Sequence, residues 1–321
     1  MNIGGGQKKL QEKPIELVFH NIHDHGIEIT DMWMKAVETH TNGRVHFTKR
    51  SGEDPEAIAV ADVVRDVPAM GGRYYMLDLI QTPFIFPNST IGSKAIAQLY
   101  AEFSELRNEL SDVKVVGLGI GALMAVFSSR AWGPIRTLED FRGARIRSLQ
   151  PIDGVFEAFG AMPQHVDFLQ ISQLLETGEL DAAVLGILPA KMFKLAERAA
   201  PYCTFVETRS ITMHPMRTFM RWSAWNSLPP DIQKIIEEIG LAGGDCWFAI
   251  QSGRDADNHL QEALEYLREN SELIKIPRGE LQRWQQLIQP LRDSAISTVE
   301  AKGLPGGKFF NRMLELVEKY S

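Results

Sequence analysis

Apolar residues follow two patterns along this chain of 321 residues, and these patterns predict strands and helices in alternation. Short apolar or alternating runs are typical of strands, whereas apolar residues spaced three and four apart form one face of a helix. The predicted strands are residues 15–20, 44–48, 113–117, 123–129, 144–149, 180–185, 203–206 and 218–222. The predicted helices are residues 30–41, 93–110, 170–176, 191–199, 280–302 and 308–319, a region over 227–270 interrupted near Gly243-Gly244, and a mainly helical stretch within 51–66. This alternation indicates an α/β fold.

The stretch 137–186 carries the strongest local signals, and Arg147 lies within it. Thr137 is a helix N-cap residue with an acid three positions later, and Gly143 ends the turn. Residues 144–149 alternate like a strand that Pro151 ends, so Arg147 is expected near the carboxyl end of that strand, the edge where ligands bind in open α/β sheets. Its guanidinium matches a carboxylate in a bidentate geometry. A surface or structural arginine is the alternative at this point.

Composition and charge exclude some classes of function. The formal net charge of −7 argues against a nucleic-acid surface, and no apolar run reaches the ~20 residues that span a bilayer. Residues 1–9 contain no hydrophobic segment, so no secretory signal is visible, and the chain is expected to be cytoplasmic or a processed mature form. Cys203 and Cys246 fit two buried thiols or one disulfide, and neither has the spacing of a metal site.

Three other patterns resemble functional motifs: a group of histidines, a run of glycines, and residues that could serve as a nucleophile or as paired carboxylates. His20, His23 and His25 form a ligand-contacting loop or an ordinary polar loop, because metal binding would require a further ligand in a defined geometry. The glycines of 117–121 lack the spacing and the following helix of a dinucleotide site. Residues with the spacing of a nucleophile or of paired catalytic carboxylates are absent from the sequence. Asp181 is interpreted as a turn or backbone cap.

Several segments, in order, resemble the solute-binding proteins of tripartite ATP-independent periplasmic (TRAP) transporters. The central ones are residues 135–147 (IRTLEDFRGARIR), 158–163 (AFGAMP) and 177–183 (TGELDAA). Further similar segments are residues 39–45 (THTNGRV), 82–86 (TPFIF) and 225–230 (WNSLPP). The resemblance covers roughly residues 15–320. It implies a two-lobed periplasmic-binding-protein-like clamshell with mixed sheets, crossing strands and a long lobe-spanning helix.

The same resemblance implies a domain organisation and a set of partners. Residues 1–14 are expected to be a disordered lead, 15–127 plus 223–250 to form lobe I, and 128–222 plus 251–321 to form lobe II and the C-terminal helices. The expected function is an extracytoplasmic receptor that closes over a small organic anion and delivers it to the small and large membrane subunits. No enzyme activity, cofactor, metal or nucleic acid is expected, and no insertion into the membrane.

The resemblance also implies which residues bind the ligand, because positions in the shared segments match the family's binding residues. Arg147 matches the arginine that clamps the ligand carboxylate, and Phe168 matches the aromatic residue that packs on the ligand. The further candidate ligand contacts are His23, Gln150, Leu185 and Arg221. Arg221 stands where the family has an asparagine, and is either a second positive charge at the ligand or a surface pair.

The sequence also departs from the family pattern. Residues 184–187 offer no polar side chain where the family often has one, and the segment before Val67 is shorter than usual by about a helix. Leu123, Met124 and Phe127 make the strand before Arg130 unusually apolar. These changes favour a monocarboxylate with an apolar or aromatic body over a dicarboxylate. The alternative function is a cytosolic small-molecule enzyme or ligand sensor on the same two-lobe scaffold, because a fold alone does not fix a function.

Overall fold

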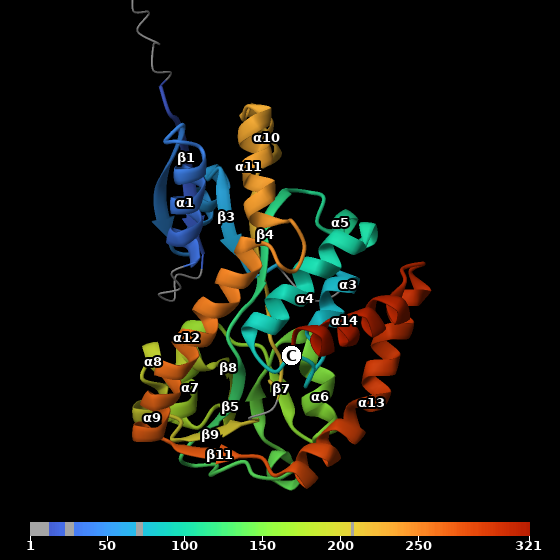
Figure 1. Ribbon diagram of the computed structural model, residues 1–321. Helices are drawn as coiled ribbons and strands as arrows, with labels where there is room; N and C mark the ends of the chain where they lie inside the picture. Colours follow the sequence, from blue (N-terminus) through green and yellow to red (C-terminus); the bar gives the residue numbers. More distant parts are fainter. Residues whose placement is uncertain (1–12, 23–28, 69–72, 207–208) are drawn as a thin grey trace, which may run out of the picture.

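The computed structural model describes residues 13–22, 29–68, 73–206 and 209–321, which form two α/β lobes, each built on one mixed sheet (Figure 1). The predicted lead, residues 1–14, lies almost entirely outside this range. The sheet of lobe I has the strand order β2-β1-β3-β10-β4, in which β10 runs antiparallel to both of its neighbours. Its strands are β1 (Ile15–Asn21), β2 (Val45–Ser51), β3 (Val63–Asp66), β4 (Lys114–Ile120) and β10 (Pro215–Met220).

The sheet of lobe II has the strand order β11-β9-β5-β8-β6-β7. Its central strands β8 and β6 run parallel to each other, as do β6 and β7, whereas β5 is antiparallel to β8 and β9. The strands are β5 (Met124–Ser128), β6 (Arg145–Arg147), β7 (Met162–Gln164), β8 (Ala182–Gly186), β9 (Tyr202–Phe205) and β11 (Glu272–Lys275).

Helices cover both sheets, and the last three helices link the lobes. Those of lobe I are α1 (Ile29–His40), α2 (Pro55–Val60), α3 (Tyr75–Ile80), α4 (Ser89–Glu102), α5 (Ser104–Glu109), α10 (Trp222–Ser227) and α11 (Pro230–Gly240). Those of lobe II are α6 (Asp153–Ala158), α7 (Ile171–Thr177), α8 (Ile187–Met192), α9 (Leu195–Arg198) and the 3-10 turns η1 (Leu138–Phe141), η2 (Gln150–Ile152) and η3 (Phe168–Gln170). The linking helices are α12 (Trp247–Asn270), α13 (Arg278–Ala301) and α14 (Gly306–Tyr320).

The chain crosses between the lobes in two extended segments, and both lie earlier in the chain than predicted. β4 belongs to lobe I, but β5, which begins at Met124, already pairs in the sheet of lobe II. The return crossing lies between β9 and β10, because β10 pairs with β3 and β4. The expected boundaries at residues 127/128 and 222/223 are therefore wrong, since β5 and β10 each belong to the other lobe.

The long helix α12 spans both lobes, as the family resemblance implied (Figure 1). It packs on β4 and α4 of lobe I and on α8, α9 and β11 of lobe II. Its approach to β4 explains the glycines of 117–121, because a Cβ on Gly117 would lie 2.7 Å from the ring of Phe248. A Cβ on Gly119 would likewise lie 2.4 Å from Oγ of Ser252 on α12, so Gly117 and Gly119 allow the close packing of α12 on β4. α14, one of the C-terminal helices, packs on α3 and α4 of lobe I.

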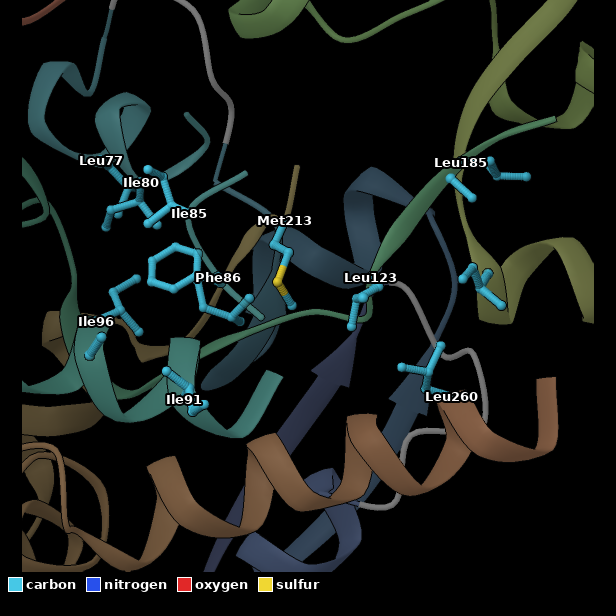
Figure 2. Packing of buried hydrophobic residues seen from close by; sticks show 14 of the residues in the cluster. Leu77, Ile80, Ile85, Phe86, Ile91, Ile96, Leu123, Leu185, Met213 and Leu260 are labelled. Carbon is cyan, nitrogen blue, oxygen red and sulfur yellow. The ribbon is translucent and has the colours of Figure 1, made fainter. Parts of the chain in front are cut away.

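The largest apolar cluster runs from lobe I through the crossing segments into lobe II. Figure 2 shows Ile80, Ile85 and Phe86 packed near Met213, with Leu123 and Leu260 farther along the same cluster and Leu185 on the side of lobe II. Burying such side chains stabilises a fold by about 1.5–3 kcal/mol each. The lobes therefore share one hydrophobic hinge core.

Some predicted elements differ from those observed. β3 lies within the stretch predicted as mainly helical, the helix predicted over 93–110 is broken at Phe103, and Trp222 begins a helix rather than ending a strand. The helix predicted over 191–199 splits at Lys194, whose φ is 50°. Most of the remaining elements lie within a few residues of their predicted bounds. At the central stretch, the Asp140 carboxylate accepts the backbone N–H of Thr137 at 2.8 Å, and Gly143 takes a φ of 78°.

Candidate ligand-binding site

A cavity of about 710 Å³ lies between the lobes, and its volume suits a small organic ligand. Two other pockets have volumes of about 280 and 410 Å³. The cavity walls from lobe I and the crossing segments include Ile22, Ser51, Gly52, Glu53, Val67, Pro68, Gln81, Gly121, Ala122, His214 and Met216. The walls from lobe II include Met124, Arg147, Leu149, Gln150, Pro151, Phe168, Leu169, Leu185, Gly186, Leu188, Pro189, Met192 and Phe193. Most of these side chains are apolar.

Arg147 ends β6, so the strand delivers its side chain to the cavity from the carboxyl edge of the sheet. Its backbone lies opposite Gln164 on β7 and Ala183 on β8. Its Nη1 donates to the carbonyl oxygen of Val184 at 3.0 Å, which fixes the guanidinium against β8. Its Nε is buried and has no hydrogen-bond partner among the residues that the structure describes.

The electrostatic setting of Arg147 favours an anion. Burial lowers the pKa of the Arg147 guanidinium from its ordinary value, because the charged form loses hydration. Within the described part of the chain, no carboxylate forms an ion pair with Arg147. An arginine remains protonated in such a setting, so the cavity wall carries a desolvated positive charge without a counter-charge. A carboxylate ligand would supply that charge and accept two N–H bonds.

Other buried arginines of the protein have acidic partners. Arg217 on β10 donates to both carboxylate oxygens of Asp66, at 3.0 and 2.7 Å. Arg65 on β3 is also buried, and its charge is favoured by Asp255 and Asp66, although desolvation lowers its pKa to about 10. Arg147 differs from these two arginines, because no acidic side chain among the described residues pairs with it.

An apolar wall from η3 and α8 lies on the lobe II side of the cavity. Phe168 and Phe193 meet edge to face, with ring centroids 5.1 Å apart. Leu169 and Met192, on the same two elements, are 71% and 48% exposed, so they form a lip that solvent still reaches. Leu185 at the end of β8 is buried. This wall can hold a hydrocarbon or aromatic body by apolar burial.

Two polar residues, Gln81 and His214, line the cavity where the crossing segments pass. Gln81 follows α3, and its side-chain Oε1 lies 2.9 Å from Nδ1 of His214. The backbone oxygen of His214 accepts the N–H of Gly121 at 2.8 Å, just beyond β4. This pair was not predicted from the sequence, because the family resemblance places the polar partner of the ligand just after Asp181. The signal that was available is one polar residue at the end of the apolar run 77–80 and another directly before β10.

The structure brings four of the predicted contacts together and separates one. Arg147, Gln150, Phe168 and Leu185 all line the cavity. Arg221 does not line it: its guanidinium donates to the carbonyl oxygens of Ala61 and Ile58, at 2.9 and 2.6 Å, and so caps the end of α2. The prediction that Arg221 contacts the ligand is corrected accordingly. His23 and His25 lie outside the described residues.

The other histidine and cysteine candidates, as far as the structure describes them, have structural roles. His20 is buried and its Nε2 lies 2.7 Å from the carbonyl oxygen of Gly52. Cys203 and Cys246 are free, buried thiols. The residues that the structure describes contain no group of three or more histidine, cysteine or acidic side chains placed to hold a metal ion. In the same part of the chain, no helix has both the length and the apolar character needed to cross a bilayer.

Comparison with known proteins gives a family match over most of the chain. The profile of the DctP family, bacterial extracellular solute-binding protein family 7, matches residues 60–298. A solute-binding protein of Sulfitobacter sp. strain NAS-14.1 is 25% identical over 235 residues, which are 71% of this chain and 66% of that protein, just under two thirds of its length.

Solved structures share the fold over nearly the whole chain. A TRAP periplasmic solute-binding protein from Bordetella bronchiseptica, with bound (R)- and (S)-mandelate, is 19% identical with a TM-score of 0.84, covering 96% of this chain and 100% of its own. A marine metagenome TRAP solute-binding protein specific for aromatic acid ligands, in complex with 3-hydroxybenzoate, is 21% identical with a TM-score of 0.83, covering 96% and 99%. These likenesses confirm the two-lobed α/β fold.

Proposed function

We propose a function from the premise that this chain belongs to the bacterial extracellular solute-binding proteins of family 7 (DctP), as the match over residues 60–298 shows. The protein is a TRAP transporter receptor that binds a small organic acid between its lobes. The acid is a monocarboxylate with an apolar or aromatic body. The family membership favours this receptor over the cytosolic enzyme or sensor that the sequence left open.

The observation that carries the proposal is the unpaired charge of Arg147 in a largely apolar cavity. A hydrogen bond to a charged group contributes roughly 1.5–3 kcal/mol. Two such bonds from Arg147 to a carboxylate would supply a large part of the ~8 kcal/mol that corresponds to micromolar affinity. The ligand's negative charge also offsets the desolvation of the guanidinium, which no described residue offsets.

The remaining lining supports one carboxylate rather than two. Arg147 is the one arginine or lysine among the described residues that line the cavity, whereas Glu53 contributes a carboxylate to the lobe I side. A second ligand carboxylate would therefore be buried without a cation of its own, which is unfavourable. Phe168 and the other apolar residues of lobe II accept the body of the ligand by burial.

The receptor role follows from two lobes joined by a common hinge. Contacts made by the ligand with both walls favour a closed state over an open one, so binding shifts the population towards closure. In this proposal the protein works in the periplasm and passes the acid to the small and large membrane subunits of the transporter.

The test is a thermal-shift screen of the wild-type protein and two matched variants against benzoate, phenylacetate, mandelate, succinate and malate. A ligand at one hundred times its Kd stabilises the folded state by about 2.7 kcal/mol, which raises the melting temperature by several degrees. We expect at least one of the three monocarboxylates to give such a shift. Arg147→Met should abolish it without unfolding the free protein, because only the clamp is removed.

Arg145→Met is the matched control, since Arg145 lies on the same strand but is paired with Asp181. This variant should keep the ligand-induced shift. An unchanged affinity in Arg147→Met would reject the clamp. Stabilisation by succinate or malate, with none by the monocarboxylates, would reject the proposed ligand class.

A further inference from the structure

We propose that Gln81 and His214 form a second recognition point, which selects a monocarboxylate whose apolar or aromatic body carries a neutral oxygen, such as a hydroxyl. This inference rests on the function proposed above, because it concerns the part of the same ligand that Arg147 does not hold. It assigns a specificity role to two residues that lie 133 positions apart in the chain.

Gln81 has an unused hydrogen-bonding group. The residue is 1% exposed and lines the cavity, and its backbone oxygen accepts the hydroxyl of Thr212 at 2.7 Å. Its Oε1 is engaged with Nδ1 of His214, but its buried Nε2 has no hydrogen-bond partner among the described residues. A buried amide N–H without an acceptor is unfavourable, so a ligand oxygen that accepts from Nε2 would be recognised.

His214 holds the amide in place for that contact. Its bond to Oε1 determines which end of the Gln81 amide is left for the ligand. Its own backbone is fixed by the N–H of Gly121, and β10 begins at the next residue. Gln81 is fixed in turn by the end of α3, where its N–H donates to the carbonyl oxygens of Asp78 and Leu79. The pair is therefore ordered before a ligand arrives, which reduces the entropic cost of recognition.

The chemistry of the pair points to a neutral oxygen rather than a second carboxylate. An amide and an imidazole offer hydrogen bonds but, when neutral, no compensating charge. A hydroxyl accepts from Gln81 Nε2 and still has a hydrogen to donate. The predicted ligand therefore has its charge at Arg147 and an uncharged polar group at Gln81.

The experiment compares phenylacetate with its 2-, 3- and 4-hydroxy isomers by isothermal titration calorimetry on the wild-type protein and on Gln81→Met. We expect at least one hydroxy isomer to bind the wild type about tenfold tighter than phenylacetate. A hydrogen bond to the buried amide contributes the free energy that corresponds to such a change in affinity. Gln81→Met has similar length but no amide, so it should remove this preference. The thermal melting curve of the free variant shows whether it is folded.

Three results would overturn the inference. Phenylacetate could bind the wild type as tightly as every hydroxy isomer, Gln81→Met could keep the preference, or 4-carboxyphenylacetate could bind as well as the best hydroxy isomer. The first and third need only the wild-type protein, so they hold even where the variant fails to fold. Failure of the proposed function is distinguishable, because then phenylacetate and its isomers would all fail to bind, and both proposals would fall.

Discussion

The two ends of strand β6 carry arginines that have different partners. Arg145 and Arg147 are two positions apart, so they project from the same face of the strand, while Ile146 is buried on the other face. Arg145 donates to both carboxylate oxygens of Asp181, at 2.9 and 2.7 Å, and to the carbonyl oxygen of Gly178. Arg147, at the carboxyl end, has one carbonyl partner and faces the cavity.

The difference shows that the amino end of β6 has a structural role, whereas its carboxyl end lines the proposed binding site. At the amino end, the Asp181 carboxylate also accepts the backbone N–H of Arg145 at 2.8 Å, so it ties β6 to the segment that leads into β8. At the carboxyl end, Arg147 lines the cavity, and no carboxylate among the described residues forms an ion pair with it. The acidic partner, Asp181, therefore lies at the amino end of β6, where it holds the strands of the sheet together. The arginine at the cavity has no acidic partner among the described residues.

The largest effect that separates the two ends, beyond the loss of binding in Arg147→Met, is expected for Asp181→Ala. This variant leaves the backbone N–H and the guanidinium of Arg145 without the Asp181 acceptor, which should cost on the order of 1 kcal/mol of unfolding free energy. Ligand affinity should stay within about threefold. Urea denaturation and calorimetry measure the two quantities.

Glu179→Ala is the control for Asp181→Ala, because Glu179 is an exposed acid two residues away. Its removal should change the unfolding free energy by less than about 0.5 kcal/mol. Equal losses in both variants would mean that the Asp181 contacts add nothing specific to the amino end of β6.

A smaller effect is expected for Arg147→Lys, which keeps the charge but loses the planar fork of donors. One ammonium cannot reproduce two parallel N–H bonds to a carboxylate, so affinity should fall about tenfold, equal to about 1.4 kcal/mol. Titration calorimetry with the best monocarboxylate measures this. Arg145→Lys should leave the affinity unchanged, and a similar loss in both lysine variants would contradict the division of roles along β6.

The smallest effect is a pH dependence of stability at the amino end. Burial would raise the pKa of the Asp181 carboxyl, but the hydrogen bonds from the Arg145 side chain and backbone outweigh burial and hold this pKa below its ordinary value of 3.8. A carboxyl with a lowered pKa in the folded state contributes stability above pH 3.8, and that contribution disappears as pH falls through the folded pKa.

The difference in unfolding free energy between wild type and Asp181→Asn should therefore be constant near neutral pH and shrink below about pH 4. Denaturation curves between pH 3 and pH 7 measure it. If this difference in unfolding free energy grew as the pH fell, the pKa of Asp181 would not be lowered by its bonds to Arg145, and the prediction would be wrong.

Much of the candidate site follows from local sequence patterns. The cap at Thr137, the stop at Gly143 and the short alternating run place Arg147 at the carboxyl end of a strand, and each of these signals acts over a few residues. The family segments added Phe168, which also lines the cavity. Buried thiols at Cys203 and Cys246 were one of two alternatives that the sequence allowed.

Contacts between distant segments could not be predicted in this way. Arg221 and Arg147 are the same residue type beside a strand end, yet Arg221 is engaged by the carbonyl oxygens at the end of α2, 160 and 163 positions away. Gln81 and His214 meet only because both crossing segments pass the same hinge. The boundary between the lobes likewise depends on which sheet β5 and β10 join.

The sequence by itself determined the α/β class, the elements around the central stretch and the arginine that the cavity presents, because caps, strand alternation and turn glycines are governed by neighbours along the chain. The tertiary structure decided which charges are paired. Arg145 meets Asp181 across 36 positions, whereas the Nε of Arg147 is buried without a partner among the described residues. The packing of strands that are distant in the chain decides whether an acidic side chain lies beside a given arginine. At Arg147 it places none among the described residues, so the proposed ligand carboxylate can bind there.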